Sequence, residues 1–248
     1  MKTVIGGVLG LALLTAPCRA DLIHYYPFTV DVSDAAGSAN GTLLGGASVS
    51  GGVLHLDGVN DYVQFAQDLV PTSGSYSVAM FARQDAIQSN FIELISQGLS
   101  GGPGFYLGHD PAGNIRASDQ WISTGVAFPA DFLFHHFALT VDALLGTSRL
   151  YVDGVLRANL GFAITSTSSG TFTRLGRQFD PFTEFFDGAI DDVRIYDRAL
   201  SGGEVAGLAG VTTSTPEPTS LALCGTGAAF LLALGRRRKR ERSTKLAG

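Results

Sequence analysis

Short runs of alternating apolar and polar residues, interrupted every few positions by Gly, Asn, Asp or Ser, constrain the fold of this chain most strongly. Seven runs are clearest: 54–58, 61–65, 75–83, 104–108, 134–142, 148–154 and 189–196. A period of two is typical of a strand with one buried face, and closely spaced turn residues favour antiparallel connections. Because no long helical period is present, the sequence predicts an all-β sandwich or barrel. One large two-sheet sandwich fits the length better than two small domains.

Two local motifs predict specific connections. Asp153 and Gly154 lie between two apolar runs, and both residue types accept the positive φ angles of a type I′ hairpin turn. Ser201 followed by Glu204 is a capping-box pair, which predicts a short helix that ends near residues 207–210. The sequence therefore predicts one hairpin and one helix near the end of a body that stops at about residue 209.

Both ends of the chain have the layout of targeting segments. Residues 1–20 begin with basic Lys2, continue with an apolar stretch and end in Ala20, so we expect a signal peptide cleaved there. A linker over 210–218 precedes an apolar segment over 219–235 and a basic tail over 236–248. As a helix the apolar segment would be about 25 Å long, at the lower limit for crossing a bilayer. The basic tail would remain on the cytoplasmic side.

The body between these segments is strongly acidic. Residues 21–235 contain eight Arg, no Lys and 21 Asp or Glu, a net charge of −13. Binding a nucleic-acid backbone needs basic surface, so no nucleic-acid partner is expected, and a divalent cation or a neutral ligand is favoured. Cys18 and Cys224 lie in the terminal segments, which leaves the body without a thiol nucleophile or a Cys-based zinc site.

Four stretches of the body carry a family resemblance. They are LIHYYPFTVDVSDAAGSANGTL (22–43), VLHLDGVNDYVQF (53–65), FHHFALTVDALLGTSRLYVDGVL (134–156) and FFDGAIDDVRIYDRALSGGEVAGL (185–208). In sequence and order they resemble the signature blocks of laminin G-like, concanavalin A-like jelly-roll domains. The resemblance implies a two-sheet antiparallel jelly-roll domain over residues 21–209. One departure is Phe134, where the family usually has Trp before the double His.

Calcium is the metal for which the sequence offers ligands. The loop over 31–41 contains Asp34 and Asn40 among small residues, and the last strand-like run contains Asp191. Carboxylate and amide oxygens are the ligands that calcium takes. Domains of the resembled family often hold a structural calcium between the early loop and the terminal strand, and Asp34 and Asp191 are the matching positions. The alternative is that Asp34 and Asn40 only make Asx turns and that Asp191 pairs locally.

Catalytic machinery is not expected. Asp191 and Asp192 are neighbours on a strand, where successive side chains point to opposite faces, so they should not flank one bond. The same argument separates His135 from His136, for which the resemblance implies a structural role. The body has four Glu: Glu93, Glu184, Glu204 and Glu217. They do not form the alternating acidic strand found in hydrolases that share this sandwich, so the sequence predicts no enzyme.

Ligand contact is expected at Trp121, whose aromatic face could stack on a sugar ring. The Phe-rich loop over 179–186 is a weaker candidate, because alternation should send Phe185 or Phe186 into the core.

Pro216, Glu217 and Pro218, followed by the apolar segment and the basic cluster, closely resemble the bacterial PEP-CTERM sorting signal. That resemblance implies an exosortase-type processing enzyme and delivery from the inner membrane to the cell surface or an extracellular matrix. The sequence thus predicts an exported, non-catalytic binding or adhesion module for a polysaccharide or a surface protein, with a possible structural calcium. A glycan-cleaving enzyme and a matrix protein without a ligand are the alternatives.

Overall fold

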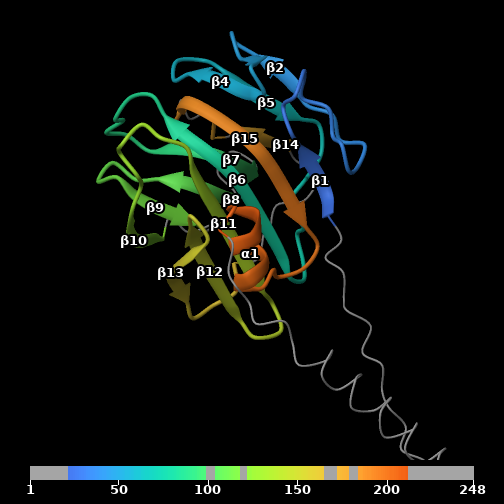
Figure 1. Ribbon diagram of the computed structural model, residues 1–248, viewed down its shortest axis with the longest axis vertical. Coiled ribbons are helices and arrows are strands. Elements are labelled where there is room, and N and C mark those ends of the chain that lie inside the picture. Colours follow the sequence, from blue (N-terminus) through green and yellow to red (C-terminus); the bar gives the residue numbers. More distant parts are fainter. Residues whose placement is uncertain (1–21, 99–103, 118–121, 165–171, 179–183, 212–248) are drawn as a thin grey trace, which may run out of the picture. The chain divides into compact units, whose positions relative to one another are not determined.

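A computed structural model describes residues 22–98, 104–117, 122–164, 172–178 and 184–211 of the chain. These residues form two antiparallel β-sheets packed face to face and one short helix (Figure 1). The expected all-β jelly-roll sandwich of two antiparallel sheets is therefore confirmed. The predicted segments over 1–20 and 219–235, the basic tail and the sorting motif lie outside the described residues.

Eight strands form the first sheet, here called sheet A. Its order is β13-β12-β11-β6-β15-β4-β3, with β1 also paired to β15. The strands are β1 (Leu22–Tyr26), β3 (Ser48–Ser50), β4 (Val53–Asp57), β6 (Tyr76–Gln84), β11 (His135–Asp142), β12 (Thr147–Val152), β13 (Val155–Leu160) and β15 (Asp187–Tyr196). Sheet A thus contains both the first and the last described strand.

Seven strands form the second sheet, sheet B, in the order β10-β9-β8-β7-β14-β5-β2. They are β2 (Thr42–Leu44), β5 (Tyr62–Phe65), β7 (Ile92–Gly98), β8 (Gly104–His109), β9 (Asn114–Ala117), β10 (Ser123–Ala127) and β14 (Phe172–Leu175). The middle strand, β7, is buried along its whole length. A strand buried on both faces shows no alternation of apolar and polar residues, which is why this one is hard to recognise from sequence.

The hydrophobic core lies between the two sheets. Tyr26 of β1 contacts Phe65 of β5 with ring centroids 4.8 Å apart, and Tyr76 of β6 contacts Phe105 of β8 at 5.8 Å. All four rings are fully buried. Burial of one large side chain of this kind stabilises a fold by about 1.5–3 kcal/mol, so contacts between sheets hold the sandwich closed.

The short helix α1 (Gly202–Leu208) covers part of the outer face of sheet A (Figure 1). Val205 of α1 packs with Ala138, Tyr151 and Tyr196 from three different strands. The predicted capping box is present: the Ser201 side chain accepts from the N–H of Glu204, and the Glu204 carboxylate accepts from the N–H of Ser201. The sequence prediction of this helix is confirmed.

The predicted hairpin joins β12 to β13. Asp153 and Gly154 have φ angles of +52° and +74°, as a type I′ turn requires, and Val152 pairs with Val155 across the turn. A Cβ at position 154 would lie 3.0 Å from the backbone of Ala206, so this turn also packs against α1. Among the described residues, no helix is long and apolar enough to cross a membrane.

We predict that Ser201→Ala lowers the free energy of unfolding by about 1 kcal/mol, because it removes an N-cap acceptor. Ser73→Ala is the matched control, since Ser73 is exposed and accepts no described hydrogen bond, and a change below about 0.5 kcal/mol is expected there. Urea unfolding of both variants measures the difference. Equal losses in the two variants would contradict a role for the cap.

Candidate functional site

The outer face of sheet B carries an unusual row of charged residues. Glu93 of β7 pairs in register with Gly108 of β8, and Gly108 pairs with Arg116 of β9. Residues directly opposite one another on adjacent strands project to the same side of a sheet. Because the flanking residues Leu107 and Ala117 belong to the core, this row points away from it. We call Glu93, Arg116 and Glu184 the acid–arginine cluster.

Glu93 and Arg116 form a buried ion pair across Gly108. Arg116 Nη2 donates to Glu93 Oε1 at 2.7 Å, and the exposed fractions of the two side chains are 2% and 0%. The Arg116 guanidinium also lies 4.3 Å from the ring centroid of Phe91. A Cβ at position 108 would lie 2.8 Å from Glu93 Oε2 and closer still to the Ile92 carbonyl. Glycine at this position therefore leaves room for the pair.

The protonation of Glu93 is shifted strongly by its environment. Burial raises the pKa of Glu93 to about 8, against the opposing effect of Arg116, and the nearby charge of Glu184 raises it further. Burial also raises the pKa of Glu184, and Arg116 again opposes the rise. Glu93 Oε2 and Glu184 Oε2 are both buried and have no hydrogen-bond partner among the described residues. Two carboxyl groups with raised pKa values thus share one face.

Glu184 reaches this face through a short pairing of two segments that are distant from β7 in sequence. Arg177 and Phe185 form an isolated β-bridge, and the N–H of Gln178 donates to the carbonyl of Glu184 at 3.3 Å. Burial raises the pKa of Tyr106 on β8, and the nearby Gln178 side chain opposes the rise. Tyr106, Gln178 and Glu184 therefore lie together.

Aromatic rings and arginines continue the face toward β5. The Arg177 guanidinium lies 4.8 Å from the ring centroid of Tyr62 and 5.1 Å from that of Phe185. Arg174 Nε donates to Gln64 Oε1 at 3.1 Å, and its guanidinium lies 6.0 Å from the Tyr62 ring. Flat rings beside hydrogen-bonding groups form the kind of surface on which sugars stack.

The side chain of Asp34 is surrounded by hydrogen-bond donors. Its Oδ1 accepts from the backbone N–H groups of Tyr25, Ala36 and Gly37, and Oδ2 accepts from that of Ala39 and contacts His24 Nδ1 at 2.6 Å. These bonds hold the pKa of Asp34 below its usual value, although burial opposes them. The acceptor positions of this carboxylate are therefore taken by donors from its own loop and from β1.

Asn40 has a similar local role, because its Oδ1 accepts from the N–H of Asp34 at 3.0 Å. No described group of three or more His, Cys, Asp or Glu residues is arranged to hold a metal ion. These contacts match the Asx-turn alternative from the sequence. The calcium site itself stays a prediction.

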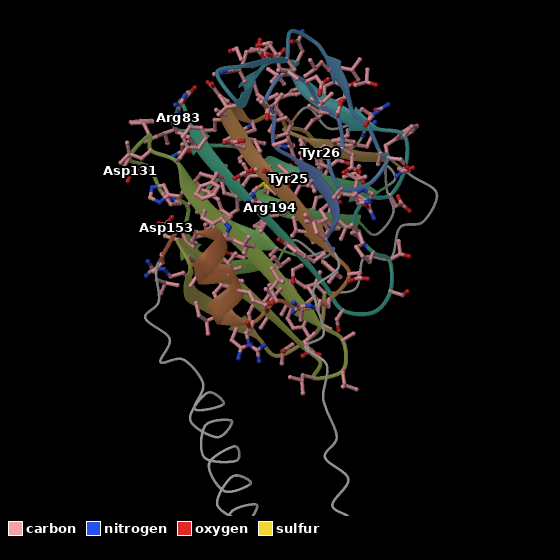
Figure 2. All side chains as sticks on the ribbon, turned by 45° about the vertical axis from the view of Figure 1, so that its right-hand side comes forward. Tyr25, Tyr26, Arg83, Asp131, Asp153 and Arg194 are labelled. Carbon is pink, nitrogen blue, oxygen red and sulfur yellow. The ribbon has the colours of Figure 1, made fainter. Side chains whose placement is uncertain are left out.

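Asp191 lies on the outer face of sheet A, where it pairs in register with Phe81, and no described hydrogen bond joins it to Asp34. The expectation that the side chains of Asp191 and Asp192 point to opposite faces of a regular strand is wrong. The pairing register of β15 with β6 shifts between Asp191 and Arg194, and Asp192 has a φ of +52°, so the strand is not regular here. Asp192 Oδ1 instead accepts from the Tyr25 hydroxyl at 2.7 Å and from Arg194 at 3.1 Å; Figure 2 labels Tyr25 and Arg194. The bulge therefore redirects Asp192 toward its neighbours in sheet A.

The two histidines occupy separate environments, as the sequence predicts. His136 is 1% exposed and packs edge-on against Phe81, and burial lowers its pKa to about 4. His135 Nδ1 contacts Asp153 at 2.7 Å and its Nε2 contacts Asp131 at 2.9 Å, and these aspartates raise its pKa although burial opposes the rise. Figure 2 labels both aspartates. His135 also lines an open cavity of about 330 Å³ with Val126, Ala127, Pro129, Val152, Asp153 and Arg157.

The remaining predicted ligand residue, Trp121, lies outside the described residues. The expectation for the Phe-rich loop is confirmed in part: Phe186 is fully buried in the core, whereas Phe185 contacts Tyr62 on the outer face of sheet B. Sequence reasoning missed the acid–arginine cluster, although Glu93 within an otherwise apolar run was a visible signal.

Burial of Glu93 predicts a pH dependence of stability. The pKa of Glu93 in the folded protein, about 8, lies above its ordinary value of 4.5. The contribution of protonated Glu93 to the free energy of unfolding is therefore complete below about pH 4.5 and is lost as the pH rises toward 8. We predict that Glu93→Gln removes part of the fall in melting temperature between pH 5 and pH 8. Melting curves across this range provide the measurement. A parallel fall in the two proteins would contradict the shifted pKa.

Solved structures with the same fold include parts of glycan-active proteins. Domain 4 of AbnA, a GH43 extracellular arabinanase from Geobacillus stearothermophilus, in complex with arabinotriose, is 24% identical, with a TM-score of 0.63 over 77% of this chain and 98% of that domain. A Trypanosoma rangeli sialidase is 16% identical, with a TM-score of 0.59 over 76% of this chain and 32% of its own.

A botulinum neurotoxin type C structure, described as showing cell entry dependent on interaction with two ganglioside molecules, is 15% identical. Its TM-score is 0.61 over 79% of this chain and 52% of that chain. This chain thus spans almost all of the arabinanase domain, about half of the neurotoxin chain and about a third of the sialidase chain. These likenesses establish the fold.

The sequence-based expectation that the chain is no enzyme is contradicted by these comparisons, because an arabinanase and a sialidase are among the proteins that contain the fold. The physical argument behind that expectation also fails. It looked for acidic residues that alternate along one strand, whereas folding places the carboxyl groups of Glu93 and Glu184, from separate segments, near Arg116.

No curated protein sequence matches this chain. The profile of the family described as the concanavalin A-like lectin/glucanases superfamily matches residues 57–206, which is more than half of the chain. The match includes all three residues of the acid–arginine cluster and ends within the capped helix α1. The chain therefore belongs to the concanavalin A-like lectin/glucanase superfamily.

Proposed function

We propose that this protein binds glycans on the outer face of sheet B. The observation that carries the proposal is the acid–arginine cluster, in which two buried carboxyl oxygens have no described hydrogen-bond partner. Leaving a buried polar atom unpaired costs about 1–3 kcal/mol, so a ligand hydroxyl that reached these oxygens would gain a favourable contact. Tyr62, which is only partly buried and lies beside the cluster, supplies a ring for stacking.

Two of the similar structures support a carbohydrate ligand. The arabinanase domain was solved with arabinotriose, and the neurotoxin structure is described in terms of two gangliosides. The superfamily to which the chain belongs is itself named for lectins and glucanases. A protein is the other partner class, since the binding domain of botulinum neurotoxin DC, which has the same fold, was solved in complex with rat synaptotagmin II.

Cleavage of the bound glycan is a second candidate function. It is favoured by the raised pKa values of Glu93 and Glu184, which share one face. Glycoside hydrolysis uses two carboxyl groups, one of which must hold a proton near neutral pH. Glu93 would be the proton donor and Glu184 the second carboxylate.

We also propose that the protein works at the cell surface or in an extracellular matrix. This proposal is supported by the sequence of residues 1–20 and by the sorting motif at Pro216, Glu217 and Pro218, with an exosortase-type enzyme as the processing partner. The predicted membrane segment would hold the precursor before processing. A glycan ligand is consistent with such a location.

Tyr62→Ala should weaken glycan binding about 5- to 30-fold, because it removes a stacking ring worth roughly 1–2 kcal/mol. Tyr25→Ala is the matched control: Tyr25 lies on sheet A, and Arg194 contacts its ring at 4.5 Å much as Arg177 contacts that of Tyr62. Isothermal titration with a panel of neutral polysaccharides measures both. Equal weakening in the two variants would contradict a site on sheet B, and no binding by the native protein would overturn the proposal.

Cleavage has its own test, the release of reducing ends from the polysaccharides that bind. If Glu93 and Glu184 act as a catalytic pair, Glu93→Gln and Glu184→Gln should each reduce release by at least about 100-fold, a typical contribution of acid–base catalysis. Asp85→Asn, which removes an exposed acid paired with Arg83, is the control and should leave release unchanged. Release that survives in both glutamine variants would rule out this assignment.

A further inference from the structure

Three residues near the start of β11 form a charged cluster that the proposed glycan site does not use. His135, the first residue of β11, lies between Asp131 of the preceding segment and Asp153 of the β12–β13 turn; both aspartates are labelled in Figure 2. His135 Nδ1 contacts Asp153 Oδ2 at 2.7 Å, and His135 Nε2 contacts Asp131 Oδ1 at 2.9 Å and Oδ2 at 3.1 Å. We call these three residues the histidine clamp.

The two contacts determine the protonation state of the ring. Both aspartate side chains are about half exposed to solvent, where a carboxyl group is ionised near neutral pH. An ionised carboxylate only accepts hydrogen bonds, and a neutral imidazole has a single N–H group. Both ring nitrogens of His135 therefore donate to their aspartates only when the ring carries two protons and a positive charge.

Asp131 and Asp153 are the charged groups in direct contact with this ring. Burial lowers the pKa of His135, but the hydrogen bonds and charges of the two aspartates outweigh burial and raise the pKa above its ordinary value of 6.5. Arg157 of β13 lines the same cavity and has the same charge as the protonated ring, which opposes protonation. The residues of β10 that line this cavity are uncharged.

The strand on the other side of β11 adds little charge at His135. On β6, Arg83 Nε donates to Asp85 at 2.7 Å, and the Arg83 guanidinium lies 5.0 Å from the ring centroid of Phe134. The next residue of β11, His136, is buried, and burial lowers its pKa to about 4, so it is neutral where His135 titrates. The two aspartates thus govern the protonation of His135.

The segment that contains Asp131 has a strained backbone. Phe132 has a φ of +59°, which is unfavourable for a bulky residue and persists only where the surroundings hold it. Asp131 Oδ1 accepts from the N–H of Leu133 at 3.1 Å, which closes a turn around Phe132. Phe132 and Leu133 are 48% and 63% exposed, so burial of their side chains adds little to hold this turn. The contact between Asp131 and His135 is what joins the turn to β11.

The two aspartates are not held equally. Asp153 Oδ1 also accepts from the N–H of His136 at 3.0 Å, and the turn that contains Asp153 packs against α1. The contact of Asp153 with His135 is also the shorter of the two. When the ring loses one proton, we therefore expect the remaining N–H to stay on Asp153. The bare Nε2 then faces the lone pairs of Asp131, and this contact is lost.

We propose that the histidine clamp is a pH-sensitive switch, in which protonated His135 holds residues 130–133 against β11 and loss of one proton releases them. The folded pKa of His135 lies above its ordinary value, so the clamp is complete below about pH 6.5 and is lost as the pH rises through the folded value. His135 and Asp153 line the open cavity of about 330 Å³, so the same proton also changes the charge of this cavity. The switch does not involve the acid–arginine cluster and is independent of glycan binding.

Nuclear magnetic resonance of the ¹⁵N-labelled full-length chain measures the release. The ring nitrogens of His135 report its protonation, and the order parameter of the Leu133 N–H reports the turn. We expect this order parameter to be about 0.85 at pH 5.5, as in a rigid backbone, and below about 0.6 at pH 9, as in a flexible one. Leu139, in the middle of β11 and paired on both sides, should stay near about 0.85 at both pH values.

Three variants separate the clamp from other effects of pH. In Asp131→Asn the amide can accept from the protonated ring and donate to the neutral one, so Leu133 should stay ordered at both pH values. His135→Gln removes the titrating group and should remove the pH dependence. His55→Gln is the matched control: His55 is also partly buried, but its Nε2 contacts the Ser50 carbonyl oxygen at 3.2 Å, so the native behaviour should remain.

Each outcome decides the proposal. A loss of order at Leu133 that follows the titration of His135, and that is absent from Asp131→Asn and His135→Gln, supports the switch. An unchanged order parameter in the native protein overturns it, as does an equal loss of order in either clamp variant. If His55→Gln abolished the pH dependence, the effect would belong to another histidine and the role of the clamp would be wrong.

Discussion

The ion pair between Glu93 and Arg116 is the interaction on which the outer face of sheet B depends. It crosses three adjacent strands at the middle of the sheet, and both side chains are almost completely removed from water. Removing one partner of a buried pair leaves an uncompensated charge that typically costs about 3–5 kcal/mol. The pair is possible only because Gly108 stands between its members.

Much of the fold could be predicted from sequence because its determinants are local. Alternating runs become strands wherever one face is buried, and the Asp153-Gly154 turn and the Ser201–Glu204 cap each depend on a few consecutive residues. The pairing of strands into two particular sheets was implied only by the family resemblance. β7 was not among the clearest runs, since each of its residues is buried and the periodicity disappears.

The candidate site could not be predicted in the same way, because its members come together only through long-range pairing. Glu93 and Glu184 belong to segments that are far apart in the chain, and Arg116 reaches Glu93 across a strand that contributes no side chain at that position. The sequence argument looked for acidic residues on one strand and so missed an arrangement across several. It also assumed regular alternation at Asp192, where a bulge changes the direction of the side chain.

The edge strand β13 bears on how copies of this protein behave when crowded together. Val155 and Leu156 are about half exposed on β13, which ends the strand order of sheet A (Figure 1). An exposed apolar edge invites a strand from another molecule to extend the sheet. Here the register of β13 against β12 shifts between Leu150 and Tyr151, and Arg157 follows the two apolar residues. At an irregular, charged edge of this kind, an incoming strand can form only a short run of backbone hydrogen bonds. This favours separate molecules over sheet-to-sheet aggregation at high local concentration.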